Sequence, residues 1–167
     1  MLYNYTPTAY KMIKKILIGV DDSTYAAHAA KYGFKLAETL NAHVGLVHIT
    51  EPIAIPTAST GADEIIGTPI QHFDMVDTDI IQAQHELSEN ILAQTARKYG
   101  GKTEITHFNE YGSTGEGIID CGKNFKADLI VLGTHHRSGF DRLISGSIAE
   151  HVVRHSHIPV LVVPFSS

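Results

Sequence analysis

Five short apolar runs, separated by stretches of helical periodicity, constrain the fold of this chain more than any other feature. Runs of this length that are rich in β-branched residues are typical of strands buried on both faces of a sheet. The candidate strands are Ile16–Val20, Val44–Ile49, Thr103–Phe108, Asp128–Gly133 and Val160–Val163. Because strand and helix alternate, the connections should be right-handed crossovers. The predicted fold is therefore an α/β domain with an open parallel sheet and helices on both faces.

Helical spacing fills the segments between the strands. The first helix should place small residues against the sheet, namely Ala26, Ala30, Gly33, Ala37 and Leu40. The second should bury Ile80, Ala83, Leu87 and Ile91 and stop at Gly100-Gly101. Two capping-box patterns, Ser113 with Glu116 and Ser147 with Glu150, predict the starts of the last two helices.

Composition excludes several classes of protein. A length of 167 residues fits one domain, which we expect to span residues 14–167 after a disordered tail at residues 1–13. The net charge of −5 argues against a broad nucleic-acid-binding face. A single cysteine, Cys121, excludes a disulfide within the chain and a zinc site built on several cysteines. No apolar run is long enough to span a membrane and no signal-peptide core opens the chain, so we expect a cytoplasmic protein.

The segment from Gly133 to Ser147 leaves the fourth predicted strand and enters the last helix. Glycines at such a place let backbone N–H groups approach an anion, and a helix N-terminus adds donors and a positive dipole end. His135, His136 and Arg137 are candidate phosphate contacts in the same loop. Two interpretations stay open, since Gly133 and Gly139 also suit turns and Ser147 also suits a helix cap.

Asp21 follows the first strand and is a candidate binding residue outside the glycine loop. Ligands of open α/β sheets bind beyond the carboxyl ends of strands, where the strand order reverses. If the first and fourth strands are neighbours there, Asp21 faces the glycine loop and can accept a hydrogen bond from an amino group or a ribose hydroxyl. The alternative is that Asp21, Asp22 or Ser23 only caps the first helix.

Several stretches of the chain resemble the universal stress protein family. They are Lys15–Ser23, Ala127–His135, Gly146–Val153 and Pro159–Val163, and the resemblance extends over residues 14–164. It implies a fold similar to the adenine-nucleotide α-hydrolase group, with strand order 3-2-1-4-5. It also implies a homodimer formed through the last strand, Val160–Val163.

The same resemblance implies a binding site for ATP, or for AMP or ADP, with Mg²⁺ as a possible companion. Asp21 and the backbone of Ile49 would hold the adenine, Gly133 would lie near the ribose, and Gly146 and Ser147 would hold phosphates. The ATP-binding members carry glycines where this chain has Gly133, His136 and Gly146, followed by a residue such as Ser147. His136 is the single departure from that motif.

Three functions remain open from the sequence. The first is a stress-response regulator that binds an adenine nucleotide and acts on an unknown protein partner. The second is a dimeric interaction module that binds no nucleotide, and the third is a weak ATPase. We find no nucleophile–base pair to support an enzyme, and the pair His151 and His155 has no third metal ligand in the sequence pattern.

Overall fold

The computed structural model describes residues 12–52, 76–135 and 147–165, and within them five parallel strands form one sheet in the order β3-β2-β1-β4-β5. The elements in chain order are β1 (Lys15–Gly19), α1 (Thr24–Leu40), β2 (His43–Thr50), α2 (Val76–Tyr99), β3 (Ile105–Tyr111), α3 (Thr114–Phe125), β4 (Leu129–His135), α4 (Ser147–His155) and β5 (Val160–Phe165). The predicted alternation and the strand order 3-2-1-4-5 are confirmed. Residues 1–11 of the tail predicted at residues 1–13, and most of the segment from Glu51 to Asp74, lie outside the described residues.

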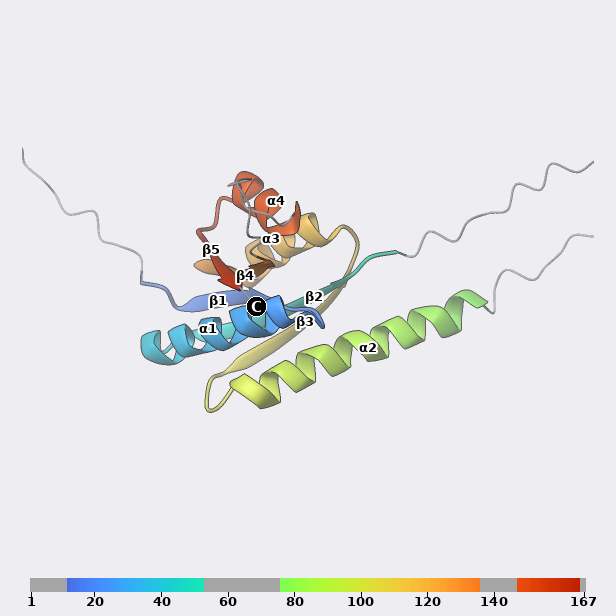
Figure 1. Cartoon of the computed structure of the whole chain (residues 1–167), viewed down its shortest axis with the longest axis horizontal. Coiled ribbons are helices and arrows are strands. Elements are labelled where there is room, and N and C mark those ends of the chain that lie inside the picture. Colours follow the sequence, from blue (N-terminus) through green and yellow to red (C-terminus); the bar gives the residue numbers. More distant parts are fainter. Residues whose placement is uncertain (1–11, 53–75, 136–146, 166–167) are drawn as a thin grey trace, which may run out of the picture.

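The helices cover the sheet on both faces, with α1 and α2 on one side and α3 and α4 on the other (Figure 1). β1 divides its side chains between the two cores that result. Ile16 and Ile18 belong to the core under α1 and α2, Leu17 belongs to the core under α3 and α4, and none of the three is exposed. Among the described helices, none combines the length and apolar character needed to cross a bilayer.

α1 has a capping residue at each end. The Ser23 hydroxyl accepts a hydrogen bond from the Ala26 N–H at 3.1 Å, and Asn41 ends the helix in the left-handed conformation. The predicted small-residue face is confirmed, since Ala26, Ala30, Gly33 and Ala37 are buried. A Cβ on Gly33 would overlap the side chain of Ile18, so small residues are what allow this helix to lie close to the sheet.

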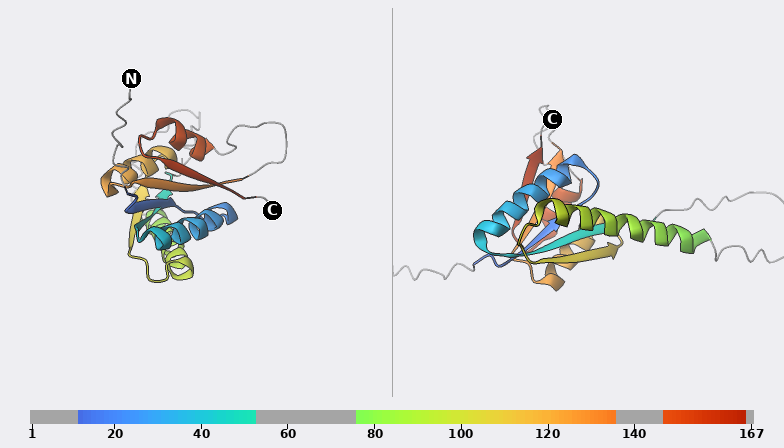
Figure 2. Two further views of the ribbon diagram at one scale, coloured as in Figure 1. Left: turned by 90° about the vertical axis from the view of Figure 1, so that its left-hand side faces the viewer. Right: turned by 90° about the horizontal axis from the view of Figure 1, so that it is seen from below.

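The predicted buried face of α2 is wrong in its middle, where Ala83 and Leu87 are exposed, whereas Ile91 packs against the core as predicted. Leu87 is 58% exposed, whereas Ser88 and Leu92 are completely buried. Only the later turns of α2 lie over the sheet, and its first turns extend past the strands (Figures 1 and 2). Apolar residues in those first turns, such as Ile81, therefore have little of the sheet to pack against.

β5 forms one edge of the sheet, with β4 as its neighbour. The Ile130 N–H donates to the Pro159 carbonyl at 2.9 Å, so the backbone groups of Pro159 face β4. Because alternate residues of a strand turn their backbone groups to opposite sides, Val162 turns its N–H away from β4. Pro164, which has no N–H to donate, falls at another outward position, as prolines in edge strands do.

We predict that a second copy of the chain pairs with this edge to form a homodimer. Val162→Pro removes an outward N–H without touching the ladder to β4, and we expect it to weaken dimerisation about tenfold or more. Light scattering over a concentration series measures the change. Leu161→Pro, which removes an inward N–H, should instead lower the stability of the monomer. A wild-type chain that stays monomeric at high micromolar concentration contradicts the prediction.

Candidate functional site

A cavity of about 310 Å³ lies at the carboxyl ends of β1, β2 and β4. Its wall also includes the first residues of α1, α3 and α4, so three helix N-termini meet around it. The position follows from the topology. β1 pairs with β2 on one side and with β4 on the other, and their crossover helices pack on opposite faces of the sheet. The gap left between those helices is the usual place for a ligand in an open α/β sheet.

Four of the predicted site residues line this cavity. They are Asp21, Ile49, Gly133 and Ser147, and they come from four different parts of the chain. His135 is the last residue of β4, and nothing is described of its side chain. The remaining predicted contacts, His136, Arg137, Gly139 and Gly146, lie outside the described residues.

Asp21 has a structural role and also lines the cavity. Its Oδ1 accepts a hydrogen bond from the Ser23 N–H at 2.8 Å, and this turn presents Ser23 as the cap of α1. Among the described residues, none is recorded as a hydrogen-bond donor to its Oδ2. The carboxylate is exposed and therefore retains an acceptor for a ligand.

Gly133 lets the first turn of α1 approach β4. A Cβ at this position would overlap the backbone of Tyr25 and would lie 3.0 Å from the Ala26 nitrogen. The obstacle is backbone rather than a flexible side chain, so a larger residue must push the first turn of α1 outward. Gly133 therefore helps to set the width of the cavity between β4 and α1.

The sequence interpretation missed His48 and Thr114, which also line the cavity. His48 lies near the end of β2, and its Nδ1 is 2.9 Å from the hydroxyl of Ser88 in α2. Burial lowers the pKa of His48, and the smaller effects of the Asp21 and Asp22 charges oppose this shift. A polar residue at the end of an otherwise apolar strand was the available signal for His48.

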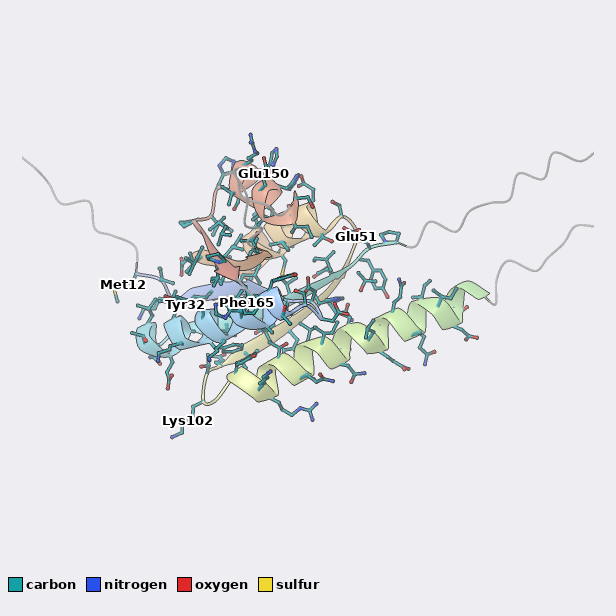
Figure 3. The ribbon with its side chains drawn as sticks, in the orientation of Figure 1. Met12, Tyr32, Glu51, Lys102, Glu150 and Phe165 are labelled. Atoms are coloured by element: carbon teal, nitrogen blue, oxygen red, sulfur yellow. The ribbon has the colours of Figure 1, made fainter. Side chains whose placement is uncertain are left out.

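α3 begins where the sequence predicts, with Ser113 as its N-cap residue, but Glu51 rather than the Ser113 side chain accepts the capping hydrogen bonds. Its carboxylate accepts hydrogen bonds from the Thr114 hydroxyl and from the Thr114 N–H, the latter at 3.3 Å, and the Ser113 side chain makes no capping bond. Figure 3 shows Glu51 at the carboxyl end of β2, on the opposite side of the molecule from Lys102. The bonds from Thr114 lower the pKa of Glu51 because they favour its charged form.

Glu116 is not part of a capping box either. Its carboxylate lies 2.8 Å from Nε2 of His151 in α4, and the His151 ring packs edgewise over Gly115. The ring centroids of His151 and His155 lie 4.3 Å apart. Within the described ranges, no three His, Cys, Asp or Glu side chains come together in a way that could hold a metal ion.

Cys121 lies in the core under α3, and burial raises its pKa to about 12. A thiol with that pKa is almost entirely protonated at neutral pH, so it is a poor nucleophile. Cys121 therefore contributes packing rather than chemistry.

Comparison with known proteins points to one family. The model of the universal stress protein family matches residues 12–164. A universal stress protein of Methanocaldococcus jannaschii is 28% identical over 152 residues, which are 91% of this chain and 82% of the relative. Universal stress protein YxiE of Bacillus subtilis is 28% identical over 153 residues, which are 91% of this chain and 99% of the relative.

Solved structures of similar fold include two with an adenine nucleotide. One is a universal stress protein in complex with cAMP, with a TM-score of 0.62 and 19% identity over 93% of this chain and 100% of that one. The other is a universal stress protein from Archaeoglobus fulgidus in complex with dAMP. Its TM-score is 0.57, with 18% identity over 91% of this chain and 98% of that one.

Gly133→Ala tests whether the close approach of α1 to β4 matters for stability. We expect the free energy of unfolding to fall by about 1–3 kcal/mol, because the added methyl group meets backbone atoms. Gly117→Ala is the matched control, since its Cβ would meet the flexible end of the Ile49 side chain. Urea denaturation of both variants measures the two losses in the free energy of unfolding. An equal or larger loss in Gly117→Ala contradicts the account of Gly133.

The Glu51 cap predicts that the stability of the protein depends on pH in the acid range. A lowered carboxyl pKa means that the cap contributes its full stabilisation above the ordinary glutamate value of about 4.3. That contribution is lost as the pH falls through the lower pKa of the folded state. Carboxyl ¹³C shifts followed by NMR should place the Glu51 midpoint below the ordinary value, and Thr114→Val should raise it. Thr39→Val, in α1, should leave it unchanged, and a Glu51 midpoint at or above the ordinary value contradicts the cap.

Proposed function

The chain belongs to the universal stress protein family, and from this premise we propose that its cavity binds ATP or a related adenine nucleotide. The protein would then act as a stress-response regulator whose conformation or choice of protein partner depends on the bound nucleotide. We propose binding rather than turnover because no activated nucleophile lines the described part of the cavity.

One observation carries the proposal, namely that the cavity has an acceptor end and a donor end. Asp21 supplies carboxylate oxygens at the end of β1, next to Ile49 at the end of β2. Ser147 supplies a hydroxyl at the start of α4, where the helix dipole and the first N–H groups favour an anion. A nucleotide matches this arrangement because its base or ribose donates hydrogen bonds and its phosphates accept them.

The adenine preference is supported by the relatives. Universal stress proteins of the same fold have been solved with cAMP and with dAMP, and both ligands consist of adenine, a furanose sugar and one phosphate. A cavity of about 310 Å³ is at the small end of the range for ligand pockets. It suits a nucleoside monophosphate directly, and additional phosphates would continue toward the start of α4. Mg²⁺ belongs to the proposal only as a companion of those phosphates.

Asp21→Asn tests the site with little change in shape. The amide oxygen can still accept from the Ser23 N–H and preserve the turn, while the second oxygen becomes an NH₂ group that opposes a ligand donor. We expect at least a tenfold loss of ATP affinity by isothermal titration calorimetry. Asp22→Asn removes the same charge one residue away, from a side chain that is not among the described lining residues, and should have a much smaller effect. Equal ATP affinity in wild type and Asp21→Asn would place the nucleotide elsewhere.

A further inference from the structure

A chain of four polar side chains runs from the cavity to the surface between α2 and β3. His48 Nδ1 lies 2.9 Å from the Ser88 hydroxyl, and Ser88 Oγ lies 2.7 Å from Oδ1 of Asn109. The Asn109 amide nitrogen then lies 3.4 Å from a carboxylate oxygen of Glu89. Ser88 is completely buried, which explains why a serine occupies the inner face of α2.

The chain of hydrogen bonds determines which nitrogen of His48 carries the proton. The Glu89 carboxylate only accepts, so Asn109 must turn its NH₂ group to Glu89 and its oxygen to Ser88. The single hydroxyl proton of Ser88 is then used on Asn109. The contact between Ser88 and His48 needs a second proton, and only Nδ1 can supply it. Neutral His48 is therefore protonated at Nδ1 and has a lone pair at Nε2.

His48 is one of the residues that line the cavity, and its ring lies close enough to Asp21 and Asp22 to be affected by their charges. Because Nδ1 is engaged with Ser88, Nε2 is the ring nitrogen that remains for a ligand. In the described part of the chain, no hydrogen-bond partner of Nε2 is recorded. Burial favours the neutral ring over the imidazolium, although the nearby Asp21 and Asp22 oppose this effect. The cavity thus has two acceptors on one side, Asp21 and His48.

We propose that Nε2 of His48, held as an acceptor by Ser88 and Asn109, determines specificity by selecting a nucleotide edge that carries N–H or O–H donors. The proposal rests on the proposed function of the cavity and adds His48 to the residues that contact the nucleotide. Two edges of an adenine nucleotide have this chemistry, namely the 6-amino group of the base and the 2′-hydroxyl of the ribose. An acceptor without a donor opposite it costs binding energy, so a ligand that lacks the donor is rejected.

The tautomer is tested first, on the full chain without ligand. Long-range ¹H–¹⁵N correlation spectra assign the proton to Nδ1 or Nε2, and we expect Nδ1–H for neutral His48. Ser88→Ala removes the group that holds this proton and should move it at least partly to Nε2. An Nε2–H tautomer in the wild type overturns the proposal, whatever the protein binds.

The selectivity is tested by calorimetry with three ligands. ATP is compared with purine riboside 5′-triphosphate, which lacks the amino group, and with 2′-deoxy-ATP, which lacks the hydroxyl. The wild type should prefer ATP over one of these by at least tenfold, and that analogue identifies the donor. His48→Phe should reduce this preference about tenfold, because it weakens the binding of ATP and leaves the binding of that analogue unchanged. Ser88→Ala should also reduce the preference.

Thr50→Val is the matched control for these variants. Thr50 lies two residues further along β2, and its buried hydroxyl has no recorded hydrogen-bond partner in the described chain, so the change should leave the preference unchanged. ATP binding with the same preference in wild type, His48→Phe and Ser88→Ala overturns the role of His48. Failure of the wild type to bind any of the three ligands overturns the proposed function itself, and the role of His48 with it.

Discussion

The rest of the structure depends on the position of β1 between β2 and β4. Its residues Ile16, Leu17 and Ile18 are inaccessible to solvent, and parallel neighbours bond to it on both sides. The chain that leaves β1 packs as α1 on one face, whereas α3 and α4 pack on the other. The helices therefore part above the carboxyl end of β1. The cavity is a consequence of this topology, and it exists before any particular side chain is placed in it.

The two ends of the sheet have different structural roles. At the amino end, Oδ2 of Asp128 accepts hydrogen bonds from the backbone N–H groups of Lys14 and Lys15 at 2.9 and 3.0 Å, which ties the start of β1 to the start of β4. The Lys15 ammonium group lies 4.8 Å from the centre of the Phe125 ring, and this contact joins the start of β1 to the end of α3. At the carboxyl end, Asp21, His48 and Ser147 are held by their elements but line an open space. Rigidity at one end thus allows polar groups to be presented at the other.

Local patterns in the sequence predicted the strands, the small-residue face of α1 and the positions of Asp21 and Gly133, because burial and capping leave short-range signals. The strand order came from the family resemblance. Contacts between distant residues were not predictable in this way. Glu51 caps a helix that begins 63 residues later, and Ser88 is buried because of partners on two strands. A hydropathy pattern treats Ser88 as a surface residue and Leu87 as a core residue, and the structure reverses both.

The length of α2 has a consequence for local unfolding of the molecule. A helix of 24 residues is about 36 Å long, whereas the seven residues of β3 extend about 23 Å. None of the described side chains of α2 before Ser88 is buried, and the hydrogen bonds of these first three turns include one between Gln82 and Glu86 and a tether from the Tyr111 hydroxyl to the Ile81 carbonyl. Isolated helical segments this short are marginal in water. These turns should fray and reform many times in the lifetime of the folded sheet, as a separate unit of low local stability at the end of a rigid one.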